Sequence, residues 1–214
     1  AKSFWRLRRE LGTLGFWRAI RASSRAKEGS PEHLNHDRFV DAFVKGAGLS
    51  REKGEELFDQ PLMQVVKACQ RYFKPIDQGV EFVRRIAPNC KIVLATNPVL
   101  TEACTRLRLS WTGLKPADFM LITHSQNSRA CKPRAVYYEE IIKQLENAGI
   151  SRDECLFIGN DPEDDGPAAA LGITTILLNP ELHEFKTLQE PSDRGAALYE
   201  GSWPLIARQF GMMR

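Results

Sequence analysis

The stretch LFIGNDPEDDGPAAALGI, residues 156–173, joins a short apolar run to an acidic cluster and then to a series of small residues. The apolar run that ends at Gly159 is typical of a buried β-strand, and the small residues favour a short helix. Four carboxylates lie between them, those of Asp161, Glu163, Asp164 and Asp165. Acidic side chains this close repel one another, and a nearby cation relieves the repulsion. The stretch therefore predicts a strand followed by a loop that binds a cation.

The bulk composition limits the class of protein. A chain of 214 residues with 43% hydrophobic and 27% charged residues is ordinary for a globular protein, and it can hold one sizeable domain or a core with an appendage. No apolar run approaches the roughly 20 residues of a membrane-spanning helix, and no signal-peptide pattern follows the basic N-terminus. The five cysteines form no C-x-x-C pair, and their odd number favours buried thiols in a reducing compartment, the cytoplasm.

The net charge of +3 conceals an asymmetry at the N-terminus. Residues 1–27 contain eight basic residues and one acidic residue, Glu10, with aromatic and aliphatic side chains among them. One interpretation is a helix with a solvated basic face and an apolar face packed on its own domain. The alternative is a surface that contacts nucleic acid or a membrane.

Helical patterns alone occupy the first part of the chain. Apolar spacing predicts helices over 3–26 and 37–45, a helix capped by Ser50, and a further helix opened by Pro61. The stretch YFKPIDQG, residues 72–79, breaks the pattern and predicts a hinge between domains. We therefore expect a helical domain over residues 1–75.

The remainder, residues 76–214, alternates between strand and helix. The predicted strands cover 91–96, 118–123, 155–159 and 174–178, and the predicted helices cover 80–87, 100–111, 133–149, 166–171 and part of 201–210. This alternation predicts an α/β fold with a Rossmann-like parallel sheet and helices on both faces. In such sheets the functional side chains gather at the carboxyl ends of the strands.

Three strand ends carry polar signals. Thr96 and Asn97 precede Pro98, which can start a helix whose N-terminus suits a phosphate, although such a Thr can equally be a helix cap. Lys132 stands at the start of a helix, where a cation is unfavourable unless an anion shares the site; the alternative is a solvated Lys. Asp161 with water ligands suits Mg²⁺, and Asp165 can orient the site or pair with Lys132. The alternative for the acidic loop is a solvated turn that caps a helix.

Together these stretches resemble the haloacid dehalogenase-like hydrolase superfamily, most of whose members are Mg²⁺-dependent phosphatases. The resemblance is carried by VLATNP (93–98), NSRACKPRAVYYEEII (127–142) and CLFIGNDPEDDGPAAALG (155–172). It implies that Thr96, Lys132 and Asp165 take part in catalysis, that Thr96, Asn97 and Lys132 bind phosphate, and that Asp161 binds Mg²⁺. It also implies that the helical first segment is a cap domain, whose residues, including Trp17, Arg18 and Arg21, would select the substrate.

One family motif is absent. No Asp-x-Asp occurs in the sequence, although the family's nucleophile and general acid/base come from this motif at the end of a central strand. Without it we expect no aspartyl-phosphate intermediate from these residues alone. The chain would begin just past that strand, and we expect the resulting gap in the sheet to be filled by another segment, a partner's strand or an unusual local pairing.

Three hypotheses follow from the sequence. The first is a phosphomonoester hydrolase whose nucleophile is missing from this chain, acting on a small phosphorylated molecule bound by Thr96, Asn97 and Lys132. The second is a non-catalytic protein of the same fold that keeps only the phosphate and metal half-site. The third, which the sequence favours least, is an interaction protein whose basic N-terminus binds nucleic acid or an acidic partner.

Overall fold

The structure, a computed structural model, describes residues 18, 21, 30, 32–193 and 195–211. The chain divides into two compact units, residues 1–131 and residues 132–214, and each is described by itself. The domain boundary predicted near residue 75 lies within the first unit and stays a prediction. The helix predicted over 3–26, with Trp17, lies outside the described residues, apart from Arg18 and Arg21.

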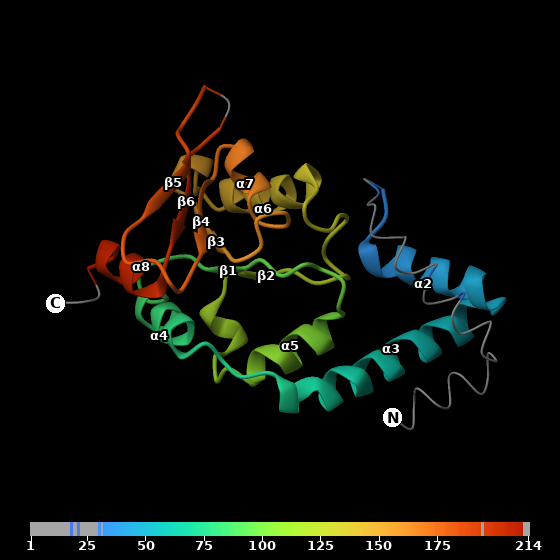
Figure 1. The fold of residues 1–214 in the computed structure, drawn as a ribbon. Coiled ribbons are helices and arrows are strands. Elements are labelled where there is room, and N and C mark those ends of the chain that lie inside the picture. The colour runs from blue at the N-terminus through green and yellow to red at the C-terminus, as the bar shows by residue number, and fades with distance from the viewer. Residues whose placement is uncertain (1–17, 19–20, 22–29, 31, 194, 212–214) are drawn as a thin grey trace. The chain divides into compact units, whose positions relative to one another are not determined.

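In the first unit, helix α2 (Asn35–Ala47) packs against helix α3 (Arg51–Cys69) (Figure 1). Phe43 and Leu57 are the buried centre of the contact, and the ring of Phe58 meets that of Phe43 edge to face at 5.6 Å. The helix predicted over 37–45 is confirmed as part of α2. Ser50 caps α3 as predicted, because its hydroxyl accepts the Lys53 N–H at 3.4 Å.

The prediction that Pro61 opens a separate helix is wrong, because Pro61 lies inside α3. Proline removes one backbone hydrogen bond, but its φ is compatible with a helix. Leu57 and Val66, on either side of Pro61, are both buried and anchor both halves of α3. Tertiary packing therefore carries the helix through the proline.

The rest of the first unit contains a short parallel sheet. The chain passes through a 3-10 turn (Gln70–Tyr72), α4 (Asp77–Ile86), β1 (Val93–Leu94), α5 (Glu102–Ser110), a second 3-10 turn (Pro116–Asp118) and β2 (Leu121–Ile122). Strands β1 and β2 are parallel, with Val93 opposite Leu121. They confirm the strands predicted over 91–96 and 118–123 but are shorter, although Met120 and Thr123 continue the backbone bonding to Ile92 and Leu94.

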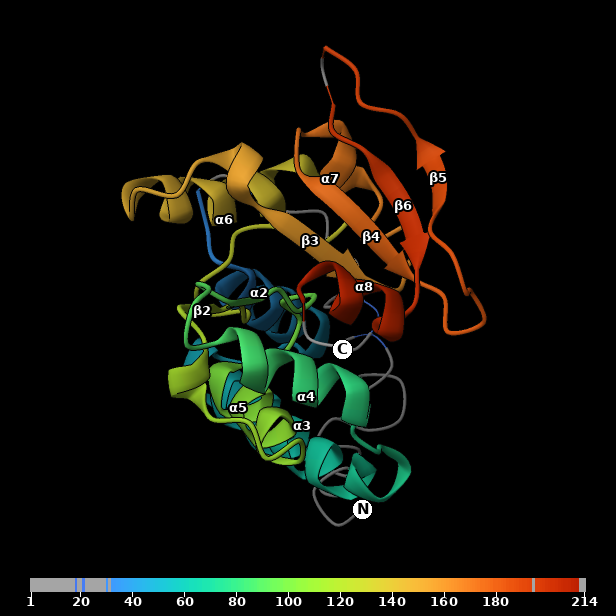
Figure 2. The ribbon, with the colours of Figure 1, turned by 90° about the vertical axis from the view of Figure 1, so that its left-hand side faces the viewer.

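The second unit contains a four-stranded sheet. Its elements are α6 (Ala135–Asn147), a 3-10 turn (Arg152–Glu154), β3 (Leu156–Gly159), α7 (Pro167–Ala170), β4 (Thr174–Leu178), β5 (Lys186–Gln189), β6 (Leu198–Gly201) and α8 (Trp203–Gln209). The strand order is β3-β4-β6-β5, in which only β5 is antiparallel to its neighbour. Helices α6 and α7 lie on one face of the sheet and α8 lies on the other (Figures 1 and 2). The predicted α/β fold with mostly parallel pairing is confirmed.

Strand β4 and helix α6 contribute to the core of the second unit, together with α7 and α8. Thr175, Ile176 and Leu177 of β4 are buried. The apolar stripe predicted on α6 is also buried: Tyr138, Ile141, Ile142 and Leu145. Gly149 takes φ +80° just after the helix, a conformation that favours glycine and stops α6 where the sequence indicated.

Strands β5 and β6 were not predicted. All four residues of β5 are exposed, so it lacks the alternation of apolar and polar residues that marks a half-buried strand. In the described part of the chain, β3 pairs with β4 on one side only, and β1 and β2 pair only with each other. The expectation that a further strand fills a gap stays a prediction. No described helix is long and apolar enough to cross a membrane.

We predict that Gly54→Val lowers the free energy of unfolding by about 1–3 kcal/mol. Gly54 is buried where α3 crosses α2, and a Cβ there would overlap the Val44 side chain. Urea denaturation followed by circular dichroism measures the change. Gln60→Ala, at an exposed position of the same helix, is the control and leaves stability nearly unchanged. Equal stability of Gly54→Val and the natural chain would contradict the close approach of the two helices.

Candidate functional site

A buried ion pair forms the centre of the candidate site in the second unit. The ammonium Nζ of Lys132 lies 2.6 Å from Oδ1 of Asp165, and the two side chains are only 9% and 5% exposed. Lys132 precedes α6, and Asp165 follows β3 in the turn that leads to α7. The ion pair therefore joins two segments 33 residues apart in the sequence.

The second oxygen of Asp165 fixes the backbone of the acidic loop. Oδ2 accepts the N–H groups of Asn160 at 2.9 Å and of Asp161 at 3.0 Å. Gly159 allows this approach, because a Cβ at that position would overlap the Asp165 carboxyl group. Both carboxylate oxygens of Asp165 thus accept hydrogen bonds, and its part in catalysis stays a prediction.

Aromatic rings surround the ammonium of Lys132. Its Nζ lies 5.0 Å from the ring centroid of Phe157 on β3 and 5.8 Å from that of Tyr137 on α6. Rings at these distances attract a cation through their negative faces. An ammonium has three N–H donors, and within the described residues Lys132 uses one of them, toward Asp165. Two donors remain to bind an anion.

Asp161 lies on the exposed side of the same loop. Its Oδ1 accepts the N–H groups of Glu163 at 2.9 Å and Asp164 at 3.1 Å, while Oδ2 accepts no hydrogen bond from the described residues. The buried Tyr138 hydroxyl donates to the Asp164 carbonyl. Burial, together with the nearby carboxylates, raises the pKa of Tyr138, so the hydroxyl keeps its proton and stays a donor. Hydrogen bonds accepted by Asp161 and one donated by Tyr138 therefore both fix the backbone of the loop.

The donor set for a metal ion is small. In the described residues, no group of three or more His, Cys, Asp and Glu side chains is arranged to hold a metal. Asp161, whose Oδ2 accepts no hydrogen bond from the described residues, fits Mg²⁺, which uses one or two carboxylates and keeps several waters. Both oxygens of Asp165 already accept hydrogen bonds, three in all, so Asp161 is the better candidate for a metal ligand.

Thr96 and Asn97 belong to the first unit. The Thr96 hydroxyl donates to the Thr123 carbonyl at 2.7 Å, and the Thr123 hydroxyl donates to the Thr96 carbonyl at 3.0 Å. These reciprocal bonds tie together the ends of β1 and β2. The expectation that Pro98 starts the next helix is wrong: Thr101 is the N-cap of α5, and its hydroxyl accepts the Cys104 N–H at 3.4 Å. The phosphate-binding roles of Thr96 and Asn97 stay predictions.

Sequence reasoning missed Asn35, which is fully buried at the start of α2. Its Nδ2 donates to the carbonyls of Ala130 at 3.0 Å and Pro98 at 3.3 Å, and its Oδ1 accepts from Arg38 at 2.7 Å. Asn35 thereby joins α2 to the loops that follow β1 and β2. An Asn before an apolar helix is ordinary in a sequence, so no local signal marked these long-range bonds.

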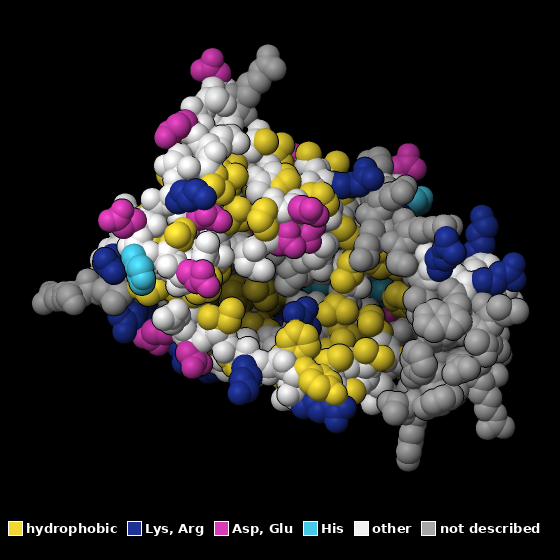
Figure 3. Space-filling view, viewed as in Figure 1, with side chains coloured by type: hydrophobic (Ala, Val, Ile, Leu, Met, Phe, Trp, Pro, Cys, Tyr) yellow, Lys and Arg dark blue, Asp and Glu magenta, His cyan; other side chains and the backbone are white. Residues whose placement is uncertain are grey.

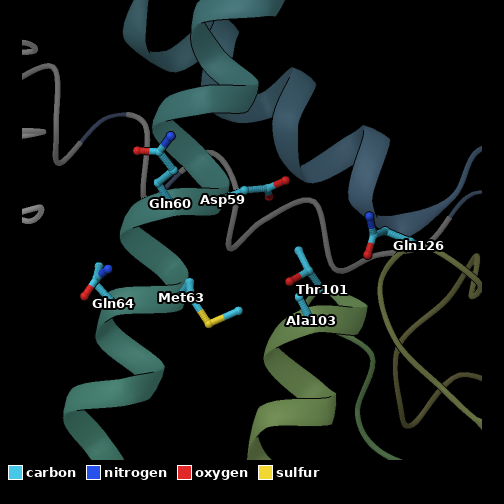
Figure 4. A pocket seen from close by; sticks show the side chains of 7 residues that line it. All are labelled: Asp59, Gln60, Met63, Gln64, Thr101, Ala103 and Gln126. Carbon is cyan, nitrogen blue, oxygen red and sulfur yellow. The ribbon is translucent and has the colours of Figure 1, made fainter.

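A pocket of about 360 Å³ with a mixed polar and apolar lining lies between α3 and the start of α5 (Figure 4). Asp59, Met63 and Thr101 point toward it, and Gln126 closes it on the other side. Asp59 Oδ1 lies 3.1 Å from Nε2 of His36 on α2. This hydrogen bond, opposed by burial and supported by the charges of Asp59 and Asp37, raises the pKa of His36 above its ordinary value of 6.5.

Comparisons with known proteins bear on the fold. No family model matches the sequence, and no curated protein matches it. Among solved structures, one match is L-2-haloacid dehalogenase from Xanthobacter autotrophicus with chloropropionic acid covalently bound, with a TM-score of 0.48 and 13% identity. A second structure of that enzyme gives a TM-score of 0.47 and 14% identity. The L-2-haloacid dehalogenase RSc1362 gives a TM-score of 0.45 and 15% identity, and the match covers 99% of this chain and 92% of that chain.

The chain is similar in fold to L-2-haloacid dehalogenases. The matches to the Xanthobacter enzyme cover 79% of this chain, which spans 65% of the length of that enzyme. The similarity concerns the fold, and what the site does is argued from its own residues.

We predict that the Lys132–Asp165 pair is strongly coupled. Lys132→Met or Asp165→Asn alone lowers the free energy of unfolding by about 3–5 kcal/mol, because each leaves an uncompensated buried charge or polar group. The double variant is less destabilised than the sum of the two single variants. Urea denaturation of all four proteins gives the coupling energy, and strictly additive effects would contradict the ion pair.

We predict that His36 stabilises the fold most at low pH. Its folded pKa is raised, so its contribution is complete below about pH 6.5 and is lost as the pH rises through the folded pKa. Asp59→Asn therefore lowers the melting temperature more at about pH 5.5 than at about pH 8.5. Glu52→Gln, which removes a charge at the start of the same helix, is the control and shows no such pH dependence. An equal loss at both pH values for Asp59→Asn would be evidence against a raised pKa.

Proposed function

We propose that Lys132 and the acidic loop form the phosphate- and metal-binding part of a phosphomonoester hydrolase site. The observation that carries the proposal is the ammonium of Lys132, which is buried, oriented by Asp165 and surrounded by two aromatic rings. A buried cation with two remaining donors suits the oxygens of a phosphate group better than a neutral ligand. The substrate class is a small phosphorylated molecule.

Each residue then has a distinct part. Lys132 donates to a phosphate oxygen, Asp165 holds the ammonium in place, and Oδ2 of Asp161 provides the protein ligand for Mg²⁺. When bound, the metal ion would neutralise charge on the phosphoryl oxygens. The resemblance adds Thr96 and Asn97 as further phosphate ligands. To donate to a phosphate, the Thr96 hydroxyl would have to exchange its bond to the Thr123 carbonyl.

Hydrolysis through an aspartyl-phosphate requires a carboxylate nucleophile that no Asp-x-Asp in the 214 residues supplies. This sequence feature favours a second candidate function, a non-catalytic protein that binds a phosphorylated ligand through the same residues.

All five cysteines are free thiols, and Cys104 and Cys131 are buried, which supports the cytoplasm as the proposed compartment.

We predict that the 214-residue chain binds inorganic phosphate through Lys132 and that Mg²⁺ strengthens this binding. In isothermal titration, the double variant Lys132→Met/Asp165→Asn, which buries no lone charge, binds phosphate at least about tenfold more weakly. Asp161→Asn keeps phosphate binding but loses the effect of Mg²⁺. Lys143→Met, which removes an exposed cation on α6, is the matched control and binds like the natural chain.

A generic aryl phosphate distinguishes the two candidate functions. The chain alone gives no Mg²⁺-dependent turnover, and a form that includes an upstream Asp-x-Asp strand does if the protein is an enzyme. Turnover by the 214 residues alone would refute the inference that they lack the nucleophile. Phosphate binding that is unchanged in the folded double variant would refute the role of Lys132.

A further inference from the structure

The segment between α3 and α4 exposes large hydrophobic side chains. Tyr72, Phe73 and Ile76 have relative exposures of 72%, 54% and 63%. Single exposed hydrophobic residues are common, but three within five residues form a patch that requires an explanation. Figure 3 shows hydrophobic side chains at the surface over the C-terminal end of α3, with basic side chains beside them.

Two arginines and a tryptophan ring contact the exposed aromatic rings of Tyr72 and Phe73. The Arg71 guanidinium lies 4.8 Å from the centroid of the Tyr72 ring, and that of Arg108, on α5, lies 5.9 Å from the Phe73 ring. The Phe73 ring also lies 6.0 Å from the ring of Trp111. The Phe73 ring therefore packs against side chains of α5 and its C-cap, and the Tyr72 ring packs against the neighbouring Arg71, so both rings have defined contacts.

The charge around the patch is positive. Lys67 and Arg71 line a shallow hollow of about 590 Å³ together with Ala68 and Gln70, and Lys74 is exposed within the segment. In the described part of the chain, Lys67, Arg71, Lys74 and Arg108 form no ion pair. Asp77, the first residue of α4, is the acidic residue next to the segment. Four unpaired cations and one carboxylate select an anionic occupant.

We name this surface the basic-aromatic patch: Lys67, Arg71, Tyr72, Phe73, Lys74, Ile76 and Arg108. Single-stranded nucleic acid would need open aromatic faces for base stacking, but each ring here already has a guanidinium near it, and Ile76 has no such face. Aromatic and aliphatic side chains flanked by Lys and Arg match the boundary between lipid headgroups and acyl chains.

We propose that the basic-aromatic patch docks on an anionic phospholipid surface. Tyr72, Phe73 and Ile76 enter the headgroup region, and the four cations contact lipid phosphate and carboxylate groups. The patch uses residues of the first unit that have no part in the proposed phosphate site, so this inference goes beyond the proposed function. Docking would concentrate the protein at a membrane and would not require a membrane-spanning segment.

Co-sedimentation with lipid vesicles tests the proposal. The natural chain binds vesicles of phosphatidylcholine and phosphatidylserine, binds phosphatidylcholine alone weakly, and loses binding as salt is raised. The variant Tyr72→Ser/Phe73→Ser/Ile76→Ser and the variant Lys67→Ser/Arg71→Ser/Lys74→Ser each weaken binding about tenfold or more. All six substituted positions are exposed and lie within residues 67–76. Circular dichroism checks that the variants keep the fold.

Matched controls separate the patch from other surfaces. Val136→Ser/Leu188→Ser removes two exposed hydrophobic residues of the second unit, and Lys143→Ser removes an exposed cation; both variants bind like the natural chain. Arg6→Ser/Arg8→Ser/Arg9→Ser tests the basic N-terminus and also retains binding.

Three results would overturn the proposal. The first is the absence of binding to the anionic vesicles. The second is binding that is lost with the N-terminal arginines and unaffected by the patch variants. The third is patch-dependent binding of single-stranded polyuridylate by a chain that does not bind vesicles, which would assign the surface to nucleic acid instead.

Discussion

The buried ion pair between Lys132 and Asp165 is the interaction on which the arrangement of the acidic loop in the second unit depends. Desolvating two charges is costly, and the cost is offset only where the geometry is good and the remaining polar atoms are satisfied. Here Asp165 binds one cation and two backbone N–H groups, and Gly159 leaves room for it. The start of α6, the end of β3 and the start of α7 are thereby held in one arrangement.

The first unit relies on neutral hydrogen bonds for the same purpose. Strands β1 and β2 are short, but Thr96 and Thr123 bond each other's carbonyls, and Asn35 bonds the loops beyond both strands. A buried Asn that satisfies several backbone groups is expensive to replace, since its partners would be left without bonds. Hydrogen bonds from side chains therefore stabilise this short sheet, whereas a longer sheet is stabilised mainly by hydrogen bonds between backbone groups.

The protein has cations in two different settings. Lys132 is withdrawn from water and neutralised by one carboxylate, which suits it to recognise a single anion in a fixed position. The cations of the basic-aromatic patch are exposed, lie beside exposed rings and have no acidic partner among the described residues. The binding of such a group depends on the average charge of an extended surface and on the ionic strength of the solution. Burial therefore distinguishes the proposed phosphate site from the proposed docking patch.

The sequence by itself determined the elements whose apolar period is strong, because burial of one face leaves a local pattern: α2, α6, β3 and β4 lie where predicted. It also singled out Lys132, Asp161 and Asp165, since charges that follow a buried strand or open a helix are unusual. Only the tertiary structure decided that α3 continues through Pro61, that polar β5 pairs with β6, and that Asn35 reaches two distant loops. Those outcomes depend on contacts between residues far apart in the chain, and such contacts leave no periodic trace in the residues that make them.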